Sequence, residues 1–425
     1  MLHSLPSSRA GLLGSLFQGY EGPAFSIRLW DGWRWSSRPD ETPAFTISIA
    51  TPAALASFLF SSNEITLGEA FIHRALDIDG DLFAVFSVAE YLFGRSRDLK
   101  QRLMGSILRA AADAGRWFRH GAQSCMRRDC AAISYHYDQP LEFFRPWLGN
   151  SLVYSCAYFR TADDSLDRAQ TQKLETICRK LRIEPGEHFL DIGCGWGSLV
   201  LYAAGEHHAH ACGITLSQSQ AETAKRRIAE AGLNTSCSVE LLDYRQCKDL
   251  YGSFDKIASV GMYEHVGLKN LRQYFKIAYQ LLRPGGVFLN HGIARSSVSP
   301  VRNDSFIERY VFPDGRLVTL PQALQAAEAA GLEVRDVENL REHYERTLCH
   351  WVEGLRQNEP ALLKHVPEST YRIWLLYMAG SAAAFRKGDI AVYQVLLSRP
   401  DGGHSRLPLV REDWYRQRRQ EVGCG

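Results

Sequence analysis

The segment from Phe189 to Leu199 most constrains the fold, because an apolar run ends in Asp191 and three alternating glycines follow it. This pattern predicts a buried strand that turns sharply into a helix. Glycine adopts backbone angles that other residues resist, and it lets the main chain approach a ligand closely. A dinucleotide site would carry G-x-G-x-x-G with an acid about 20 residues later. Here the spacing is G-x-G-x-G and Cys212–Leu216 holds no carboxylate, which favours S-adenosylmethionine over a nicotinamide cofactor.

The length of 425 residues predicts two domains, which we place at residues 1–125 and 126–425. A net charge of +2 argues against a dedicated nucleic-acid binder. The ten cysteines form no C-x-x-C pair and no zinc-spaced cluster, so we expect no metal site and a reducing, cytoplasmic environment. No signal peptide and no membrane-spanning segment are expected, since the apolar stretch 373–385 is too short to cross a bilayer.

Residues 95–128 are basic, with nine Lys or Arg against two Asp. One interpretation is a solvated helix and linker between the two domains. The other is a cationic face that meets anionic lipid headgroups, and the sequence does not separate the two.

The N-terminal part begins with a Ser- and Gly-rich stretch, 1–20, which we expect to be loosely held. A hairpin is predicted over 25–35, and Thr51 is expected to cap a helix that starts at Pro52. The acidic run 77–81 lacks the later ligands of a calcium loop, so a turn capping the next helix is favoured over calcium binding.

The larger part alternates strands and helices, as in an α/β fold. Apolar runs predict strands at residues 189–192, 211–216, 254–260, 287–291, 332–337 and 390–397, with another ending at 241–244. This order predicts a mostly parallel seven-strand sheet with helices on both faces. The helix after 271 is expected to stop at Pro284-Gly285-Gly286, and the histidines at 207, 208 and 210 are expected in a surface loop.

Five polar clusters lie at the carboxyl ends of predicted strands, where parallel strands present ligands. They are Asp191, Thr215, the pair Asp243 and Tyr244, the stretch from Gly261 to Glu264, and the stretch from His291 to Ile293. Each has a structural alternative: Gln220 could form a capping box with Ser217, and Tyr244 could simply pack. Asp243 is a candidate acceptor for an adenine amino group.

Several motifs together resemble the cyclopropane-fatty-acyl-phospholipid synthases and the related mycolic-acid methyltransferases. They lie at residues 154–159, 190–197, 213–217, 264–267, 291–293 and 343–348. The resemblance covers about 130–400, and the segment 67–71 is similar to the small extra domain of the phospholipid enzymes. It implies a Rossmann-like class I methyltransferase domain of seven strands with inserted helices, plus a small N-terminal α+β domain.

The resemblance also implies site residues. Those matching S-adenosylmethionine contacts are Tyr154, Ser155, Gly193, Gly195, Thr215, Gln220, Asp243, Tyr244 and Gly261, beside which Asp191 stands at its strand end. Those matching the groups that hold a catalytic bicarbonate are Cys156, Glu264, His291, the backbone of Ile293, and Tyr344. Cys156 has no activating neighbour, so a non-covalent role is favoured over a nucleophile. For His291, placement beside the methyl donor outweighs a merely structural role.

The implied activity is transfer of a methylene group from S-adenosylmethionine to the cis double bond of an unsaturated phospholipid acyl chain. A bound bicarbonate would deprotonate the intermediate carbocation. The expected enzyme is cytoplasmic, peripherally associated with the inner membrane face, and a homodimer. Alternatives are methylation without ring closure, giving a branched chain, and a non-catalytic lipid-binding relative.

Overall fold

The computed structural model describes residues 6–60, 64–103, 139–299, 305–312 and 317–415. The described residues fall into two compact units. One contains residues within 1–126, 302–313 and 359–383, and the other contains the rest. The predicted division at 125/126 lies outside the described residues and stays a prediction. Most of the basic stretch 95–128 also lies outside them, and so do the side chains of its described part.

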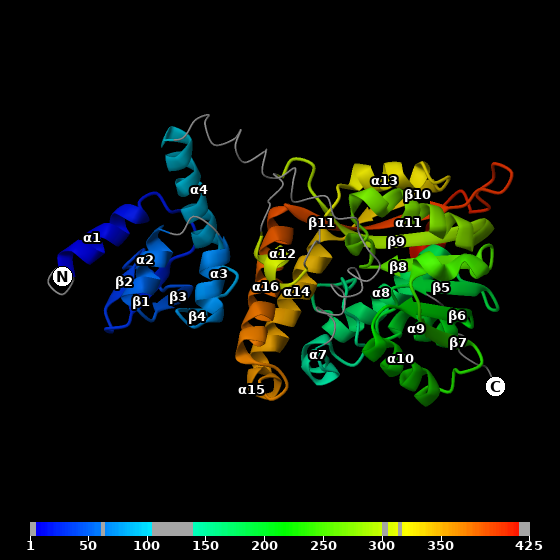
Figure 1. Cartoon of the computed structure of the whole chain (residues 1–425), viewed down its shortest axis with the longest axis horizontal. Coiled ribbons are helices and arrows are strands. Elements are labelled where there is room, and N and C mark those ends of the chain that lie inside the picture. The colour runs from blue at the N-terminus through cyan, green and yellow to red at the C-terminus, as the bar shows by residue number, and fades with distance from the viewer. Residues whose placement is uncertain (1–5, 61–63, 104–138, 300–304, 313–316, 416–425) are drawn as a thin grey trace. The chain divides into compact units, whose positions relative to one another are not determined.

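The first unit is built on a four-stranded sheet with the order β2-β1-β3-β4 (Figure 1). Its strands are β1 (Phe25–Leu29), β2 (Arg34–Ser36), β3 (Phe45–Ile49) and β4 (Leu76–Gly80). β1 and β2 form the predicted antiparallel hairpin, and β1 and β3 are parallel. Its helices are α1 (Pro6–Leu16), α2 (Pro52–Phe60), α3 (Glu64–Ile72), α4 (Val85–Leu103), α12 (Phe306–Tyr310), α15 (Glu359–Leu362) and most of α16 (Glu368–Lys387).

Two segments distant in sequence complete this unit. Helix α12 is fixed to α3, because the Phe306 N–H donates to Glu64 Oε1 at 2.8 Å and the Tyr310 hydroxyl to Glu69 Oε1 at 2.7 Å. From α16, the buried Arg372 guanidinium donates to the Phe71 carbonyl at 2.7 Å. The N-terminal sheet is therefore packed with helices encoded more than 200 residues later.

Local predictions in this unit have mixed outcomes. Thr51 caps α2 as expected, since its hydroxyl accepts from the Ala54 N–H at 3.1 Å. The expectation of a loose stretch is wrong for residues 6–16, which form α1, and Phe17 is buried behind them with its ring 5.0 Å from Phe25. The acidic run is mostly strand β4, and Asp81 caps the following turn by accepting from the Phe83 and Ala84 N–H groups.

The second unit contains a seven-stranded sheet in the order β10-β11-β9-β8-β5-β6-β7, which confirms the predicted α/β fold. Its strands are β5 (His188–Ile192), β6 (His210–Thr215), β7 (Cys237–Leu241), β8 (Phe254–Val260), β9 (Leu282–Arg295), β10 (Glu333–Asn339) and β11 (Ile390–Ser398). β11 runs antiparallel to both of its neighbours, whereas β5 to β9 are mutually parallel.

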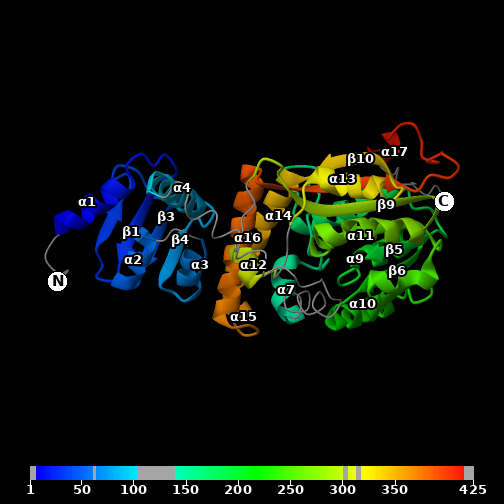
Figure 2. The same cartoon turned by 45° about the horizontal axis from the view of Figure 1, so that its top comes forward.

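Helices pack on both faces of this sheet (Figures 1 and 2). One apolar core joins the sheet to α8 (Leu166–Leu181), α9 (Ser198–His207) and α10 (Gln218–Glu230). A second core joins it to α11 (Gly267–Leu281) and α13 (Leu320–Glu328). The remaining elements are α7 (Leu141–Leu148), η1 (Tyr244–Leu250), η2 (Tyr263–His265), α14 (Arg341–Gln357) and α17 (Glu412–Tyr415).

Two sequence-based expectations are corrected here. The Pro284-Gly285-Gly286 segment does not follow the helix as a break, because β9 already begins at Leu282 and runs through it. His207 is not in a surface loop: it ends α9, is buried, and its Nε2 lies 3.0 Å from Glu175 Oε2.

Candidate active site

The glycine turn connects β5 to α9 at the carboxyl edge of the sheet. Gly193, Gly195 and Gly197 have φ angles of +84°, +54° and +80°, values that strain any L-residue with a side chain. A Cβ atom on Gly193 would also lie 3.1 Å from the Met262 side chain. The backbone conformation thus favours glycine at all three positions, as the sequence predicts.

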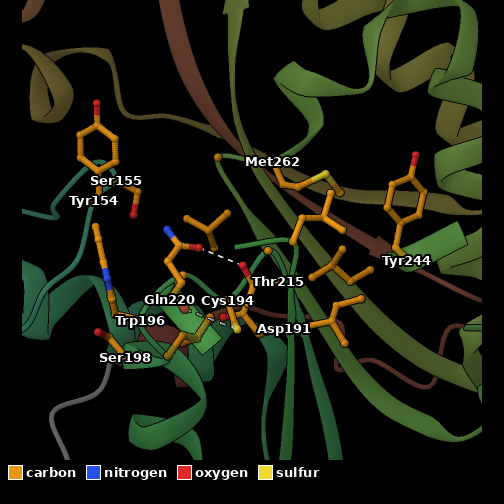
Figure 3. Close-up of a pocket in the computed structure, with 18 of the residues that line it drawn as sticks. Tyr154, Ser155, Asp191, Cys194, Trp196, Ser198, Thr215, Gln220, Tyr244 and Met262 are labelled. Atoms are coloured by element: carbon orange, nitrogen blue, oxygen red, sulfur yellow. Dashed lines mark hydrogen bonds between the residues drawn. The ribbon is translucent and has the colours of Figure 1, made fainter. Parts of the chain in front are cut away.

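A cavity opens directly above this turn. Its volume is about 1200 Å³, including the part of its mouth that is open to solvent. Nine of the ten predicted cofactor residues line it: Tyr154, Ser155, Asp191, Gly193, Gly195, Thr215, Gln220, Tyr244 and Gly261. Figure 3 shows the side chains of Tyr154 and Tyr244 on opposite sides of the cavity. Strand ends far apart in the sequence therefore do converge at one place.

The position of the Gln220 side chain decides between a capping box with Ser217 and a place at the cavity. Ser217 caps α10 by accepting from the Gln220 N–H, but the Gln220 side chain does not return to the cap. Instead its Oε1 accepts from Thr215 Oγ1 at 2.9 Å, at the cavity wall (Figure 3). The structure thus lacks the capping box and leaves this amide at the cavity.

Asp243, the tenth predicted residue, does not line the cavity. Its carboxylate pairs with the Arg245 guanidinium, with an Oδ2–Nη2 distance of 2.6 Å, and it caps η1 by accepting from the Arg245 N–H at 2.9 Å. Its contact with an adenine amino group stays a prediction.

Lys173 lines the same cavity, and sequence reasoning missed it. It is buried, and its Nζ donates to Ser155 Oγ at 3.0 Å. Burial lowers the pKa of Lys173 to about 8. Burial also raises the pKa of Asp191 to about 7, although the nearby Lys173 opposes this rise. The sequence does contain a sign of this burial. Lys173 stands four residues from both Ala169 and Ile177 and therefore lies on the apolar face of α8.

Glu264, His291 and Ile293 lie together beside the cavity wall. The Ile293 N–H donates to Glu264 Oε1 at 2.7 Å. His291 is two residues away on β9 and therefore on the same face of the sheet. The Gly261 N–H, from the cavity lining, donates to the His291 carbonyl at 2.8 Å. Three of the predicted catalytic residues are thus gathered in one place.

Two atoms of this group are buried without a hydrogen-bond partner among the described residues. They are Glu264 Oε2 and His291 Nε2. Burial raises the pKa of Glu264 to about 7. The pKa of His291 is held well below its ordinary value, first by burial and then by the charges of Lys173 and Lys180. An unsatisfied buried polar atom costs about 1–3 kcal/mol, so a pair of them points to a small polar ligand.

Cys156 and Tyr344 meet at another point, the Leu340 carbonyl. Cys156 Sγ donates to it at 3.8 Å and the Tyr344 N–H donates to it at 3.0 Å. Leu340 in turn donates its N–H to Val392 on β11, which pairs with Ile293 on β9. Burial raises the pKa of the Cys156 thiol, which keeps it protonated and disfavours the covalent-nucleophile alternative.

No group of three or more His, Cys, Asp or Glu side chains in the described parts of the chain could hold a metal ion. Among the same residues, no helix combines the length and the apolar character needed to cross a bilayer.

Two family models match this chain. The model of the family described as mycolic acid cyclopropane synthetase matches residues 124–395. A second family, described only as a domain of unknown function, matches residues 12–92.

Individual relatives extend the similarity over most of the chain. A probable fatty acid methyltransferase of Pseudomonas putida is 40% identical over 395 residues, covering 92% of this chain and 96% of that protein. The cyclopropane-fatty-acyl-phospholipid synthase of Escherichia coli is 39% identical over 264 residues, covering 62% and 66%.

Among solved structures, the mycolic acid cyclopropane synthase CmaA1 complexed with SAH and CTAB is similar, with a TM-score of 0.60 and 33% identity. The similarity covers 63% of this chain and 97% of that one. With the family match, it shows that the chain belongs to the mycolic acid cyclopropane synthetase family, whose members are S-adenosylmethionine-dependent methyltransferases that modify lipid acyl chains.

Proposed function

We propose that this protein is a cyclopropane synthase that converts cis double bonds of phospholipid acyl chains into rings, using S-adenosylmethionine and a bound bicarbonate. The observation that carries the proposal is that Glu264 Oε2 and His291 Nε2 are both buried and have no hydrogen-bond partner within the residues that the structure describes. The phospholipid substrate is inferred from the similarity to the Escherichia coli enzyme of that name.

S-adenosylmethionine fits the cavity lining. The glycine turn lets the main chain approach a ligand closely. Asp191 Oδ1, which is buried without a partner among the described residues, would accept from a charged amino group. Ser155, Thr215 and Gln220 add polar atoms at the same wall.

A small anion fits the second group. A neutral histidine supplies one N–H donor, and Glu264 supplies an acceptor when ionised or a donor when protonated. The expected contact of the Ile293 backbone stays a prediction. Its N–H serves Glu264 and its carbonyl accepts from the Tyr263 hydroxyl at 2.9 Å.

When bound, S-adenosylmethionine supplies the methyl carbon and bicarbonate accepts the proton lost as the ring closes. The protein's part is to hold the double bond in line and to exclude water, and positioning of this kind lowers a barrier by several kcal/mol. Aromatic rings can stabilise positive charge on the lipid. Tyr344 packs with its ring 6.0 Å from Trp351 and 4.8 Å from Phe385, which gives such faces near Cys156.

A second candidate function is methylation without ring closure. The specific observation in its favour is the P. putida relative, a probable fatty acid methyltransferase that matches nearly the whole chain. Purified protein should be incubated with S-adenosylmethionine and vesicles of unsaturated phospholipid, and the acyl products analysed by mass spectrometry and proton NMR. Cyclopropane methylene signals at high field support the proposal. A methylidene branch, formed when the carbocation loses a proton without closing the ring, keeps alkene signals, and this result would replace the proposal by the second candidate.

Peripheral membrane association and a homodimer belong to the same proposal. Replacing Arg116, Arg119, Arg127 and Arg128 by neutral residues should weaken binding to anionic vesicles, most strongly at low salt. Unchanged binding would favour the other interpretation of residues 95–128, a solvated helix and linker. Sedimentation of the full chain tests the dimer.

A further inference from the structure

Three buried side chains from three different elements form a line that ends on His291. Lys180 comes from α8, Gln394 from β11 and His291 from β9, and each is 1% exposed. Lys180 Nζ lies 2.7 Å from Gln394 Oε1, and Gln394 Nε2 lies 3.2 Å from His291 Nδ1. Gln394 and His291 are direct cross-strand partners in the antiparallel pairing of β11 with β9.

The chemistry of lysine fixes the direction of this line. An ammonium group has three donors and no acceptor, so the Gln394 carbonyl oxygen must face Lys180. The amide nitrogen then faces His291 and donates to Nδ1. The Glu338 carboxylate forms an ion pair with Lys180 Nζ. Its negative charge stabilises the buried lysine in the ammonium form.

The consequence reaches the other ring nitrogen of His291. A neutral imidazole carries one proton, and an Nδ1 that accepts a hydrogen bond must leave that proton on Nε2. Nε2 is the buried atom that has no partner among the described residues. Nε2–H is therefore a donor that has no acceptor in the described parts of the chain.

We propose that Lys180 and Gln394 are positioning residues that lock His291 in the Nε2–H tautomer, so that Nε2 permanently offers a hydrogen bond to the reaction's anion. The anion itself rests on the proposed function, whereas the tautomer does not. In the absence of the lock, Nδ1 could carry the proton and Nε2 would present a lone pair that repels an anion.

The decisive experiment uses the full-length protein labelled with ¹⁵N-histidine, with the His291 signals assigned through His291→Asn. The wild type should show the Nε2–H pattern without added bicarbonate. In Gln394→Glu, the new carboxylate accepts from Nδ1–H, so the signals should change to a protonated Nδ1. A wild-type ring with Nδ1–H, or an unchanged pattern in the variant, would overturn the proposal.

Turnover provides the second readout. Gln394→Glu should lower kcat about 100-fold or more, the size expected for loss of one donor to a developing or bound anion, with S-adenosylhomocysteine affinity within about twofold of wild type. Asn290→Asp is the matched control, because it too creates a buried carboxylate, on β9 instead of β11. It faces the other side of the sheet and accepts from the Tyr274 hydroxyl at 2.8 Å. Equal losses in the two variants would indicate a merely structural effect and count against the proposal.

The two proposals fail differently. If the wild type has the Nε2–H tautomer but turnover is independent of bicarbonate, the anion assignment is wrong while the lock stands. If turnover depends on bicarbonate but His291 carries Nδ1–H, the lock is wrong while the anion assignment stands.

Discussion

The cavity above the glycine turn and the His291–Glu264 group lie side by side but are built differently. The cavity depends on backbone conformation, with Gly193, Gly195 and Gly197 at positive φ. The other group depends on buried side chains from distant elements, with pKa values displaced by burial. If the proposed function holds, methyl-donor binding and proton removal should respond to different substitutions, and each experiment below tests that separation.

The largest effect is expected for Glu264→Gln. It removes the carboxylate whose Oε1 accepts from the Ile293 N–H and whose Oε2 is buried, so turnover should fall about 100–1000-fold while S-adenosylhomocysteine affinity stays within about twofold. Calorimetric titration and product formation measure the two quantities. Glu187→Gln is the control, because Glu187 lies just before the first residue of β5 and does not line the cavity. Equal losses of affinity and turnover in Glu264→Gln would show that cofactor binding and the step assigned to Glu264 are not separable.

The next effect concerns stability against pH. Burial raises the pKa of Glu264 from 4.5 to about 7, so the folded state holds this proton more tightly than the unfolded state does. The stabilisation by this group is present below about pH 4.5 and is lost as the pH rises through about 7, a change of about 3 kcal/mol. Urea unfolding between pH 4.5 and 8 should show a shallower pH slope in Glu264→Gln than in wild type. Identical slopes would mean that the carboxyl is not buried in solution.

A third experiment perturbs the cavity alone. Gly193→Ala forces an L-residue to φ +84° against Met262, so it should lose about 1–2 kcal/mol of stability and also weaken cofactor binding. Gly186→Ala is a matched control: its φ is +81°, but a Cβ there meets no atom within 4 Å and it does not line the cavity. We expect similar losses of Tm in both and weaker cofactor binding only in Gly193→Ala. Equal cofactor affinities in Gly193→Ala and Gly186→Ala would show that the glycine turn does not contribute to cofactor binding.

The smallest effect is expected for Tyr344→Phe. It keeps the aromatic packing against Trp351 and Phe385 and removes only a hydroxyl, so turnover should fall about 10-fold, the loss of roughly one hydrogen bond. Product formation with unchanged cofactor affinity checks this. A wild-type rate would confine Tyr344 to a packing role.

Much of the second unit could be predicted from sequence because its signals are local. The apolar runs and the glycine turn predicted a seven-strand, mostly parallel sheet, and the strand Phe254–Val260 lies where the pattern places it. The convergence of the predicted cofactor residues could also be predicted, because the carboxyl ends of parallel strands meet at one edge of the sheet.

What the sequence could not provide depends on pairings between distant segments. Gln394 gives no sign of its partner until β11 is placed beside β9, 103 residues away in the chain. Lys173 and Lys180 look like ordinary charged residues of an exposed helix until their face of α8 is buried. His207 is similar: its neighbours 208 and 210 are polar, but its own burial depends on Glu175 in another helix.

The antiparallel position of β11 bears on how the protein is made. The contact between Lys180 and Gln394 spans 214 residues, and β11 is the last strand of the sheet to be translated. Every residue that lines the cavity precedes β11 in the chain. The ring of His291 therefore gains Gln394 as its partner only after the whole cavity lining has been translated.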